Sequence, residues 1–375
     1  MEKVIYLDNA ATTRPNPRAV STASAFLEEK WFNPSALYGG GEGVKREIKS
    51  AREGILSRIA DPFLYELVFT SCGTEADNQA VFCGAKRGNA VTTLSEHAAV
   101  YSSFQELKNR GVEPRYARLD RDGRVNEESL LSLVDDKTSL VSVVHVASET
   151  GAVNDVVRLA ALVKRKNPRC LFHSDGVQAF GKIPVRLKNE IDLYSVSAHK
   201  IGGVKGTGAL IKKKSLKNFV YLFGGEQENG ARSGTENVFG VMCFSRAAEE
   251  KSRTLEEDAK RVKSLRERLW AGLDKDLFVR ISPEDGTPYI LTVAAIGLRG
   301  AVIQQLLSKR NIYVGTGSAC SSKKPFSRTI EACGYGKEIL YGVLRMSFSP
   351  ETTEEEIDLC ARALNEEARA MKGRL

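Results

Sequence analysis

Residues 195–210 read SVSAHKIGGVKGTGAL, and an apolar, strand-like run at 191–196 (IDLYSV) leads directly into His199 and Lys200. A glycine-rich turn follows. Lysine is among the residues that are least often fully buried. A lysine at the end of a core strand is therefore either a surface cap or an amine that is used in chemistry. The segments on either side show what kind of sheet this strand belongs to.

Between about residues 45 and 215, short apolar runs alternate with amphipathic stretches that are rich in lysine and glutamate. The runs are LVFT (67–70), AVTTL (90–94), LVSVV (140–144), CLF (170–172) and LYSV (193–196). Near-continuous hydrophobic strands separated by helical segments indicate a mostly parallel sheet that is covered on both faces. The pattern predicts an α/β fold.

The C-terminal third has a different pattern. A charged stretch at 244–275 carries apolar residues at helical spacing. The segments beyond it are strand-like YILTVAAIG (289–297), helix-like AVIQQLLSKR (301–310), and strand-like NIYVGTG (311–317) and VLRMSFS (343–349). Thr353 and Glu356 then form a capping box that opens a final helix. We expect a large α/β domain at 14–255 and a smaller α+β domain formed by 1–13 and 256–375.

Composition narrows the class of protein. The chain has 375 residues and a net charge of +8, with charges of both signs interspersed, and it shows no signature of nucleic-acid binding. No secretory signal or apolar run of membrane-spanning length is present. The seven cysteines are scattered and never form a C-x-x-C pair, which argues against a disulfide framework and a zinc site. We expect a cytoplasmic protein.

All four histidines fall at or just beyond the ends of apolar runs: His97, His145, His173 and His199. In open α/β sheets the ligand crevice lies outside the carboxyl ends of the strands, so this placement favours a site there. The alternative is that each is an ordinary histidine with its hydrogen bonds satisfied. No H-x-x-x-H or Cys/His spacing indicates a metal.

A second strand end carries an acid and an amide. Asp175 and Gln178 follow the run at 170–172, and Lys200 lies 25 residues after Asp175. A strand-end aspartate is also a common helix cap. An acid and an amine in one crevice nevertheless suit pyridoxal phosphate, because the lysine forms a Schiff base and the aspartate keeps the pyridine nitrogen protonated.

A phosphate group needs its own binding site. The segment FTSCGTEA (69–76) runs from a strand through small residues into a helix, which would place free N–H groups at a positive helix end. A simple tight turn would look similar. The chain contains neither a P-loop nor a dinucleotide fingerprint, so a different phosphate-bearing cofactor is favoured.

Two further residues stand out. Cys320 lies among small polar residues beside two lysines (TGSACSSKK, 316–324), which indicates an exposed loop and a thiol of lowered pKa. It is either a nucleophile or an incidental surface cysteine. Arg345 lies inside the apolar run at 343–349. Its guanidinium requires an anion, which is either a bound carboxylate or a structural ion-pair partner.

Together these segments resemble the cysteine desulfurases of the nitrogen-fixation and iron–sulfur-cluster type, within the aspartate-aminotransferase-like pyridoxal phosphate enzymes of fold type I. The motifs that carry the resemblance are YLDNAATT (6–13), FNPS (32–35), FTSCGTEADN (69–78), SEHAAV (95–100), HSDGVQ (173–178), SAHKIGG (197–203), RSGTEN (232–237), GSACSS (317–322) and RMSFSPETTEEEID (345–358). The resemblance implies a homodimer that takes sulfur from L-cysteine, leaves alanine and an enzyme persulfide, and passes the sulfur to an acceptor protein.

The resemblance also implies roles for individual residues. Lys200 would hold the cofactor and shuttle the Cα proton, His97 would stack on the ring and assist proton transfer, and Cys320 would attack the sulfur. The cofactor-binding residues would be Asp175 at the ring nitrogen, Gln178 at the phenolic oxygen with Ser148 nearby, Gly73, Thr74, Ser197 and His199 at the phosphate, and Thr235 reaching in from the partner subunit. The substrate carboxylate would be bound by Asn33 and Arg345.

The chain departs from the family pattern at four positions. Ser148, in HVASE (145–149), replaces an asparagine near the phenolic oxygen. Gly73 stands where alanine is common, Ala198 where glycine is common, and Glu226 interrupts a glycine triplet. A selenocysteine lyase or an aminotransferase of the same fold is the alternative function, and an inactive basic interaction protein is the alternative from another class.

Overall fold

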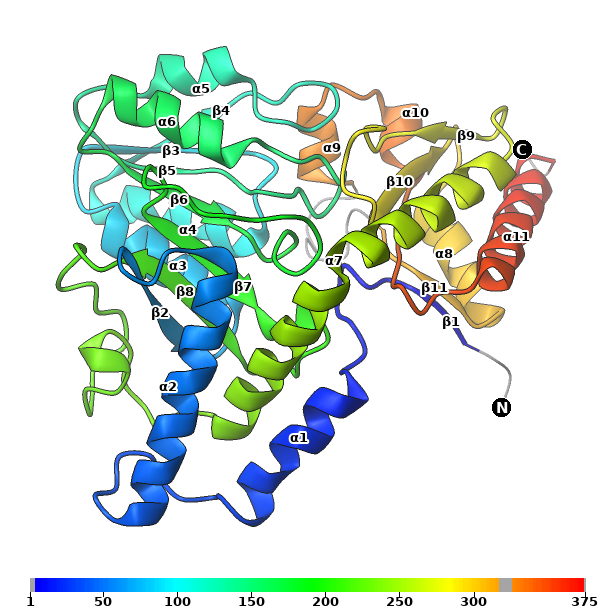
Figure 1. The fold of residues 1–375 in the computed structure, drawn as a ribbon. Helices are drawn as coiled ribbons and strands as arrows, with labels where there is room; N and C mark the ends of the chain where they lie inside the picture. The colour runs from blue at the N-terminus through cyan, green and yellow to red at the C-terminus, as the bar shows by residue number, and fades with distance from the viewer. Residues whose placement is uncertain (1–3, 317–325, 374–375) are drawn as a thin grey trace.

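The computed structural model describes residues 4–316 and 326–373 and shows a large sheet with helices on both faces, connected by one long helix to a smaller region (Figure 1). Cys320 and the rest of 317–325 lie outside the described residues. No helix in the described part of the chain combines the length and the apolar character that crossing a membrane requires.

The large sheet has seven strands in the order β2-β8-β7-β6-β5-β3-β4. Its strands are β2 (Tyr65–Thr70), β3 (Asn89–Thr93), β4 (Glu113–Ala117), β5 (Thr138–Ser142), β6 (Leu171–Asp175), β7 (Leu193–Ser197) and β8 (Gly208–Lys213). Only β8 is antiparallel to its neighbours, β2 and β7; the other adjacent pairs are parallel. The predicted α/β class with a mostly parallel sheet is confirmed. The apolar runs predicted five of these strands and missed β4 and β8.

The helical elements lie before, between and after these strands. They are α1 (Pro17–Glu28), α2 (Gly39–Ile59), α3 (Gly73–Gly84), α4 (Ala98–Leu107), η1 (Lys108–Arg110), α5 (Glu127–Leu133), α6 (Val156–Lys166), η2 (Ala198–Lys200), η3 (Glu228–Gly230), α7 (Val238–Gly272), α8 (Gly300–Lys309), α9 (Arg328–Ala332), α10 (Lys337–Leu340) and α11 (Glu354–Lys372). Two apolar clusters flank the sheet, one containing residues of α2, α5, α6 and α7 and the other residues of α3 and α4.

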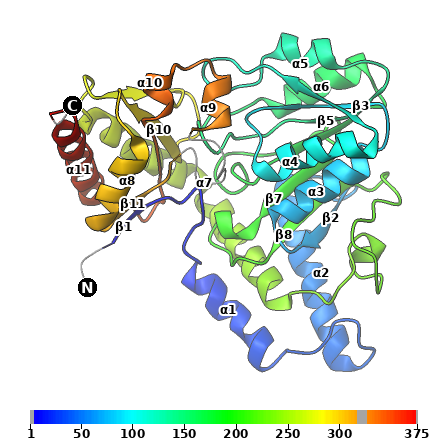
Figure 2. The same cartoon turned by 180° about the vertical axis from the view of Figure 1, so that it is seen from behind.

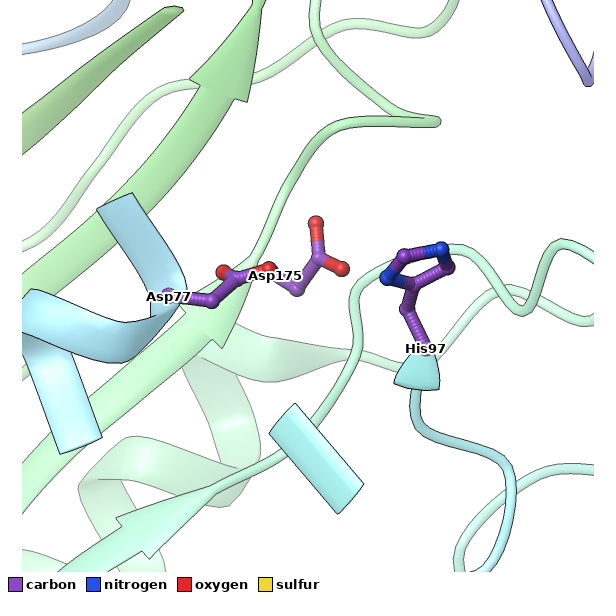
Figure 3. A group of neighbouring side chains, drawn as sticks. All are labelled: Asp77, His97 and Asp175. Atoms are coloured by element: carbon purple, nitrogen blue, oxygen red, sulfur yellow. The ribbon is translucent and has the colours of Figure 1, made fainter. Parts of the chain in front are cut away.

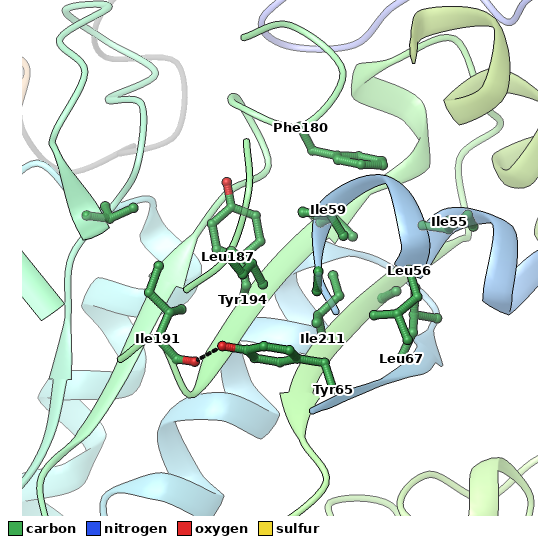
Figure 4. Packing of buried hydrophobic residues seen from close by; sticks show 14 of the residues in the cluster. Ile55, Leu56, Ile59, Tyr65, Leu67, Phe180, Leu187, Ile191, Tyr194 and Ile211 are labelled. Atoms are coloured by element: carbon green, nitrogen blue, oxygen red, sulfur yellow. Dashed lines mark hydrogen bonds between the residues drawn. The ribbon is translucent and has the colours of Figure 1, made fainter. Parts of the chain in front are cut away.

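The first cluster shows why α2 packs where it does. Its apolar residues recur at helical spacing, and Ile55, Leu56 and Ile59 pack against Tyr65 and Leu67 of the next strand (Figure 4). The Tyr65 hydroxyl donates to the carbonyl oxygen of Ile191 at 2.7 Å, so this buried polar tip is satisfied. The contact ties the start of β2 to the segment that leads into β7, at the edge of the sheet opposite the carboxyl ends of these strands.

The smaller region has a core of its own. β10 (Ile290–Ala295) pairs with β9 (Phe278–Arg280) and β12 (Val343–Ser347), and β1 (Ile5–Leu7) pairs in parallel with β11 (Ile312–Val314). Residues of β1, α7, α8 and α11 share one apolar cluster with these strands. Figure 2 shows the N-terminal strand within this region, far in sequence from its partner.

Two sequence expectations apply to this part of the chain. The capping box is confirmed, because Thr353 Oγ1 accepts from the backbone N–H of Glu356 while the Glu356 carboxylate accepts from Thr353 N–H. The domain boundary at residue 255 stays a prediction. It falls inside α7, which continues without a break from the large sheet to the smaller region.

Candidate functional site

The candidate site lies at the carboxyl edge of the large sheet. Because β8 alone is reversed, β2, β3, β5, β6 and β7 all end at this edge. The start of α3, Asp175 at the end of β6, and Ser197 at the end of β7 are therefore brought to the same side of the sheet. This is the edge at which open α/β sheets bind ligands.

Lys200 ends the short helix η2, immediately after β7. Its Nζ donates to the carbonyl oxygens of Ala10 at 2.7 Å and Ala11 at 2.8 Å. The same N-terminal segment is held in place by Thr13, whose backbone N–H and hydroxyl both donate to the carbonyl oxygen of His199 at 2.9 Å. The amine is therefore directed at the main chain of a distant segment.

Asp175 and His97 face one another across the site, with Asp77 of α3 behind them (Figure 3). One ligand atom from each of the three side chains lies within 4.8 Å of the other two. Burial raises the pKa of Asp175, although the nearby His97 opposes the shift. Burial lowers the pKa of His97, whose Nδ1 accepts from the Ala99 N–H at 3.2 Å. A buried acid is thus held beside the imidazole base of the solvent-exposed residue His97.

The turn after β6 carries Gln178. Its Nε2 donates to the carbonyl oxygen of Ala10 at 2.7 Å, so Gln178 and Lys200 share one acceptor. The turn begins at Gly176, where a Cβ atom would lie 1.9 Å from the Tyr194 ring. No larger residue fits at that position without moving the ring. The backbone that carries Asp175 and Gln178 is therefore packed directly on β7.

The start of α3 fits the predicted anion-binding role. Its N-cap residue, Cys72, makes no side-chain cap hydrogen bond, and the first N–H groups of a helix have no acceptor within the helix. The neighbouring Ser197 Oγ is buried without a hydrogen-bond partner among the described residues. Thr74 is exposed and His199 is half-buried, with its Nδ1 at 3.1 Å from Thr12 Oγ1. A buried hydroxyl without a partner beside free N–H groups indicates a place for an anion.

Arg345 lies on β12 and contacts two predicted site elements. Its Nη1 donates to the carbonyl oxygen of Ser148 at 3.0 Å, and its Nη2 forms an ion pair with Asp8 Oδ1 at 2.8 Å. The Nε atom is buried without a partner among the described residues. The sequence left open whether the anion of Arg345 is a bound carboxylate or a structural one, and the structure shows a structural partner, Asp8.

Three predicted site residues are not joined to this group by the described contacts. Asn33 lies in the α1–α2 loop, where its Oδ1 accepts from the Ser35 N–H at 2.9 Å, and that loop lies far from β7 in Figures 1 and 2. Thr235 is exposed in the loop between η3 and α7. Cys320 falls outside the described residues.

Two of the four histidines are ordinary buried histidines. His145 Nδ1 lies 2.7 Å from the Tyr194 hydroxyl, and His173 hydrogen-bonds to Ser142 at 2.8 Å and Ser195 at 3.0 Å. Burial lowers the pKa of His145 to about 4 and that of His173 to about 3, so both are neutral near pH 7. His145 and His173 therefore match the alternative of ordinary histidines whose hydrogen bonds are satisfied within the protein.

Sequence reasoning missed three buried polar residues at the site, namely Asp77, Glu96 and Lys182. Glu96 precedes His97, and its carboxylate accepts from the Val144 N–H at 2.8 Å. Lys182 follows Gln178 by four residues and donates to it at 2.8 Å. Their positions in the sequence could have identified them, because each lies within four residues of a predicted site residue or motif.

Known proteins share this architecture. The family model described as aminotransferase class-V matches residues 5–360. A cysteine desulfurase of Cereibacter sphaeroides is 39% identical over 369 residues, covering 96% of this chain and 94% of that protein. The cysteine desulfurase NifS of Azotobacter vinelandii is 35% identical over 368 residues, covering 96% and 91%.

A solved structure titled NifS-like protein superposes with a TM-score of 0.90 at 34% identity, covering 97% of this chain and 99% of that one. The family match spans most of the chain, and the relatives are matched over nearly their whole length. The chain belongs to the aminotransferase class-V family.

Proposed function

We propose that this protein is a pyridoxal phosphate-dependent cysteine desulfurase, which removes sulfur from L-cysteine to give L-alanine and a persulfide on Cys320. The observation that carries the proposal is the convergence of Lys200, Asp175 and His97 at one sheet edge, with a helix start that has no side-chain cap. The cysteine desulfurase names of the relatives support the same activity.

The described residues fit the cofactor. Ser197 Oγ and the free N–H groups of Gly73 and Thr74 suit the phosphate, because this buried hydroxyl otherwise has no partner. Asp175 suits the ring nitrogen, since a pyridinium would compensate the buried carboxylate. The His97 side chain is directed toward Asp175 (Figure 3), and its imidazole would stack on the ring.

When bound, pyridoxal phosphate supplies an electron sink that makes the bonds at Cα and Cβ of an amino acid easier to break. Lys200 would hold the aldehyde carbon through its Nζ and move the Cα proton. Asp175 would retain a proton at the ring nitrogen, Gln178 and Ser148 would face the phenolic oxygen, and His199 would join the phosphate ligands. Arg345, with its buried Nε, would bind the substrate carboxylate together with Asn33.

Cys320 would take the sulfur. Its thiolate attacks the Sγ of the substrate, the Cβ–S bond breaks, and its electron pair remains with the three-carbon product, which leaves as alanine after protonation. The persulfide is then passed to an acceptor protein. A selenocysteine lyase or an aminotransferase would also need Lys200, so Cys320 is the residue that separates the functions.

We infer that the working form is a homodimer. Several large apolar side chains near Asn33 and the Thr235 loop are strongly exposed, namely Leu37 at 92%, Phe223 at 86% and Trp31 at 67%. Exposed large apolar side chains on these two loops favour a protein interface. In a dimer, Thr235 of one subunit would reach the phosphate site of the other.

The test uses full-length protein loaded with pyridoxal phosphate and supplied with L-cysteine and a reductant. We expect equal amounts of alanine and sulfide, no cofactor colour in Lys200→Ala, and retained colour without persulfide in Cys320→Ser. Cys83→Ser is the matched control, because that thiol is 9% exposed and directed at the Val220 carbonyl. Full-rate alanine release by Cys320→Ser would refute the assigned role, and a wild-type protein that takes up no pyridoxal phosphate would favour an inactive interaction protein.

A further inference from the structure

Lys182 is a buried lysine that the proposed reaction does not use. It ends the turn after β6 and is 6% exposed. Burying a lysine is costly unless its charge is paired. Among the residues that the structure describes, no ion pair includes Lys182. A buried lysine without a carboxylate partner requires an explanation.

The groups around Lys182 increase this cost. Burial lowers its pKa well below the ordinary value, and the positive charges of Lys200, Lys251 and Arg345 lower it further. Lys251 is itself paired with Asp258 at 3.0 Å, and the Tyr289 ring lies 6.0 Å from the Lys182 amine. Burial and the three neighbouring cations therefore disfavour the charged amine, and the Tyr289 ring offers only a weak opposing attraction.

Lys212 provides the contrast. It is 4% exposed, but its amine forms an ion pair with Glu66 and also donates to the Leu216 carbonyl oxygen at 2.9 Å. Lys212 is thus a buried charge with a carboxylate partner, and its ion pair joins β8 to the edge strand β2. Within residues 4–316 and 326–373, the Lys182 amine makes one hydrogen bond, and its acceptor is the predicted site residue Gln178.

That contact is with the Gln178 carboxamide. Lys182 Nζ donates to Gln178 Oε1 at 2.8 Å, and Gln178 Nε2 donates to the Ala10 carbonyl oxygen at 2.7 Å. Because a carbonyl oxygen only accepts, the NH2 end of the amide must face Ala10 and the oxygen must face Lys182. Two anchors at opposite ends hold the amide, and one N–H of the NH2 group remains for a further acceptor.

The backbone sets this arrangement. The turn is wound by hydrogen bonds from the N–H groups of Ala179 and Phe180 to the Gly176 carbonyl oxygen, and it brings residues 178 and 182 together. Gly181 has φ +69° and lies where a Cβ atom would approach the Ile201 side chain to 2.9 Å. The turn is therefore closely packed against the segment that follows Lys200, and Ala10 accepts from both Gln178 and Lys200.

We propose that Lys182 is a positioning residue that holds the Gln178 amide with its remaining N–H directed into the cofactor site. This inference rests on the proposed function, because it takes the phenolic oxygen of pyridoxal phosphate as the acceptor of that N–H. It also explains why a lysine is buried at this position, although the buried amine does not stabilise the fold.

The first measurement is the affinity of the apoprotein for pyridoxal phosphate, followed by visible absorption. Lys182→Met removes one of the two hydrogen bonds that hold the Gln178 amide. We expect this variant to bind pyridoxal phosphate roughly 3–10-fold more weakly than the wild type. Lys212→Met should bind the cofactor as the wild type does. Wild-type affinity in Lys182→Met would overturn the inference while leaving the proposed function intact.

The second measurement is a double-mutant cycle. If Lys182 acts through Gln178, then Lys182→Met should have no further effect on affinity in a Gln178→Leu background. The pH midpoint of the visible absorption change should likewise shift in Lys182→Met and not shift again in the double variant. An undiminished effect in the Gln178→Leu background would show that Lys182 acts by another route and would overturn the inference.

The third measurement needs no cofactor. Replacing a buried unpaired lysine by methionine should leave the melting temperature of the apoprotein unchanged or raised at pH 7, whereas Lys212→Met leaves Glu66 unpaired and lowers it by several degrees. A fall in Lys182→Met as large as that in Lys212→Met, or failure to fold, would identify a structural lysine and overturn the inference. If the wild type takes up no pyridoxal phosphate, both proposals fail.

Discussion

Arg345 and Asp8 form an ion pair with 2.8 Å between Nη2 and Oδ1, although 337 residues separate them in the chain. The pair joins β12 to the segment after β1, and the carbonyl oxygen of Ser148 accepts from the same guanidinium at 3.0 Å. Two hydrogen bonds thus hold the Arg345 guanidinium, while its buried Nε has no partner among the described residues.

Arg345→Lys should weaken the use of cysteine. The planar guanidinium of arginine can bond to Ser148 and Asp8 and at the same time reach a substrate carboxylate. A single lysine amine cannot make all of these contacts at once. We expect kcat/KM for L-cysteine to fall by at least about 10-fold, corresponding to ~1.4 kcal/mol, with pyridoxal phosphate affinity within roughly twofold of the wild type. Unchanged kcat/KM would show that Arg345 serves only the ion pair with Asp8.

Ser197→Ala should weaken binding of pyridoxal phosphate. The hydroxyl is buried without a hydrogen-bond partner in the part of the chain that the structure describes, and hydrogen bonds to charged groups contribute ~1.5–3 kcal/mol. A titration of the apoprotein should show a Kd raised at least about 10-fold. Ser195→Ala is the control on the same strand, because its hydroxyl is already bonded to His173 at 3.0 Å. Equal effects of the two substitutions would argue against a phosphate ligand at residue 197.

Glu96→Gln should change how stability depends on pH. Burial raises the pKa of Glu96 from its ordinary 4.5 to about 8. Between these values the folded protein holds a proton that the unfolded chain has lost, so wild-type stability falls as pH rises, by roughly 1.4 kcal/mol per pH unit. Glutamine mimics the protonated acid, and the advantage of the variant should grow from pH 4.5 to pH 8 and then level off.

Urea denaturation of the apoproteins at several pH values tests this prediction. Glu53→Gln is the control, because the Glu53 side chain is 63% exposed on α2 and the substitution should give a difference from the wild type that stays small across this pH range. A pH-independent difference between Glu96→Gln and the wild type would mean that Glu96 is ionised in the folded protein throughout the range.

Mixed dimers should test the proposed role of Thr235. If Thr235 acts in the partner's site, then a dimer of one Lys200→Ala and one Thr235→Ala subunit contains one native site and one site that lacks both residues. Such a dimer should recover about half of the wild-type activity, because subunit exchange rebuilds a complete site. Should Thr235 act within its own subunit, no complete site forms and the mixture stays as impaired as its parents.

Local patterns in the sequence predicted much of the fold. Alternating apolar runs and amphipathic segments predicted the α/β class, and Thr353 with Glu356 marked the start of α11, because strand burial, helix periodicity and capping each depend on residues that are near in sequence. The reversed strand β8 was missed because its run follows a glycine-rich turn, and β4 because only its last residue, Ala117, is buried.

For the site, the strand ends alone predicted that Asp175 and Lys200 would lie at one sheet edge, since parallel strands share the direction of their carboxyl ends, whereas Ser197 was predicted only from the family resemblance. The tertiary structure decided what each side chain meets there. The pairing of Arg345 with Asp8, the sharing of the Ala10 carbonyl by Gln178 and Lys200, and the burial of Lys182 all join distant segments. Such contacts depend on which polar groups are buried together, and the local periodicity of a sequence does not contain that information.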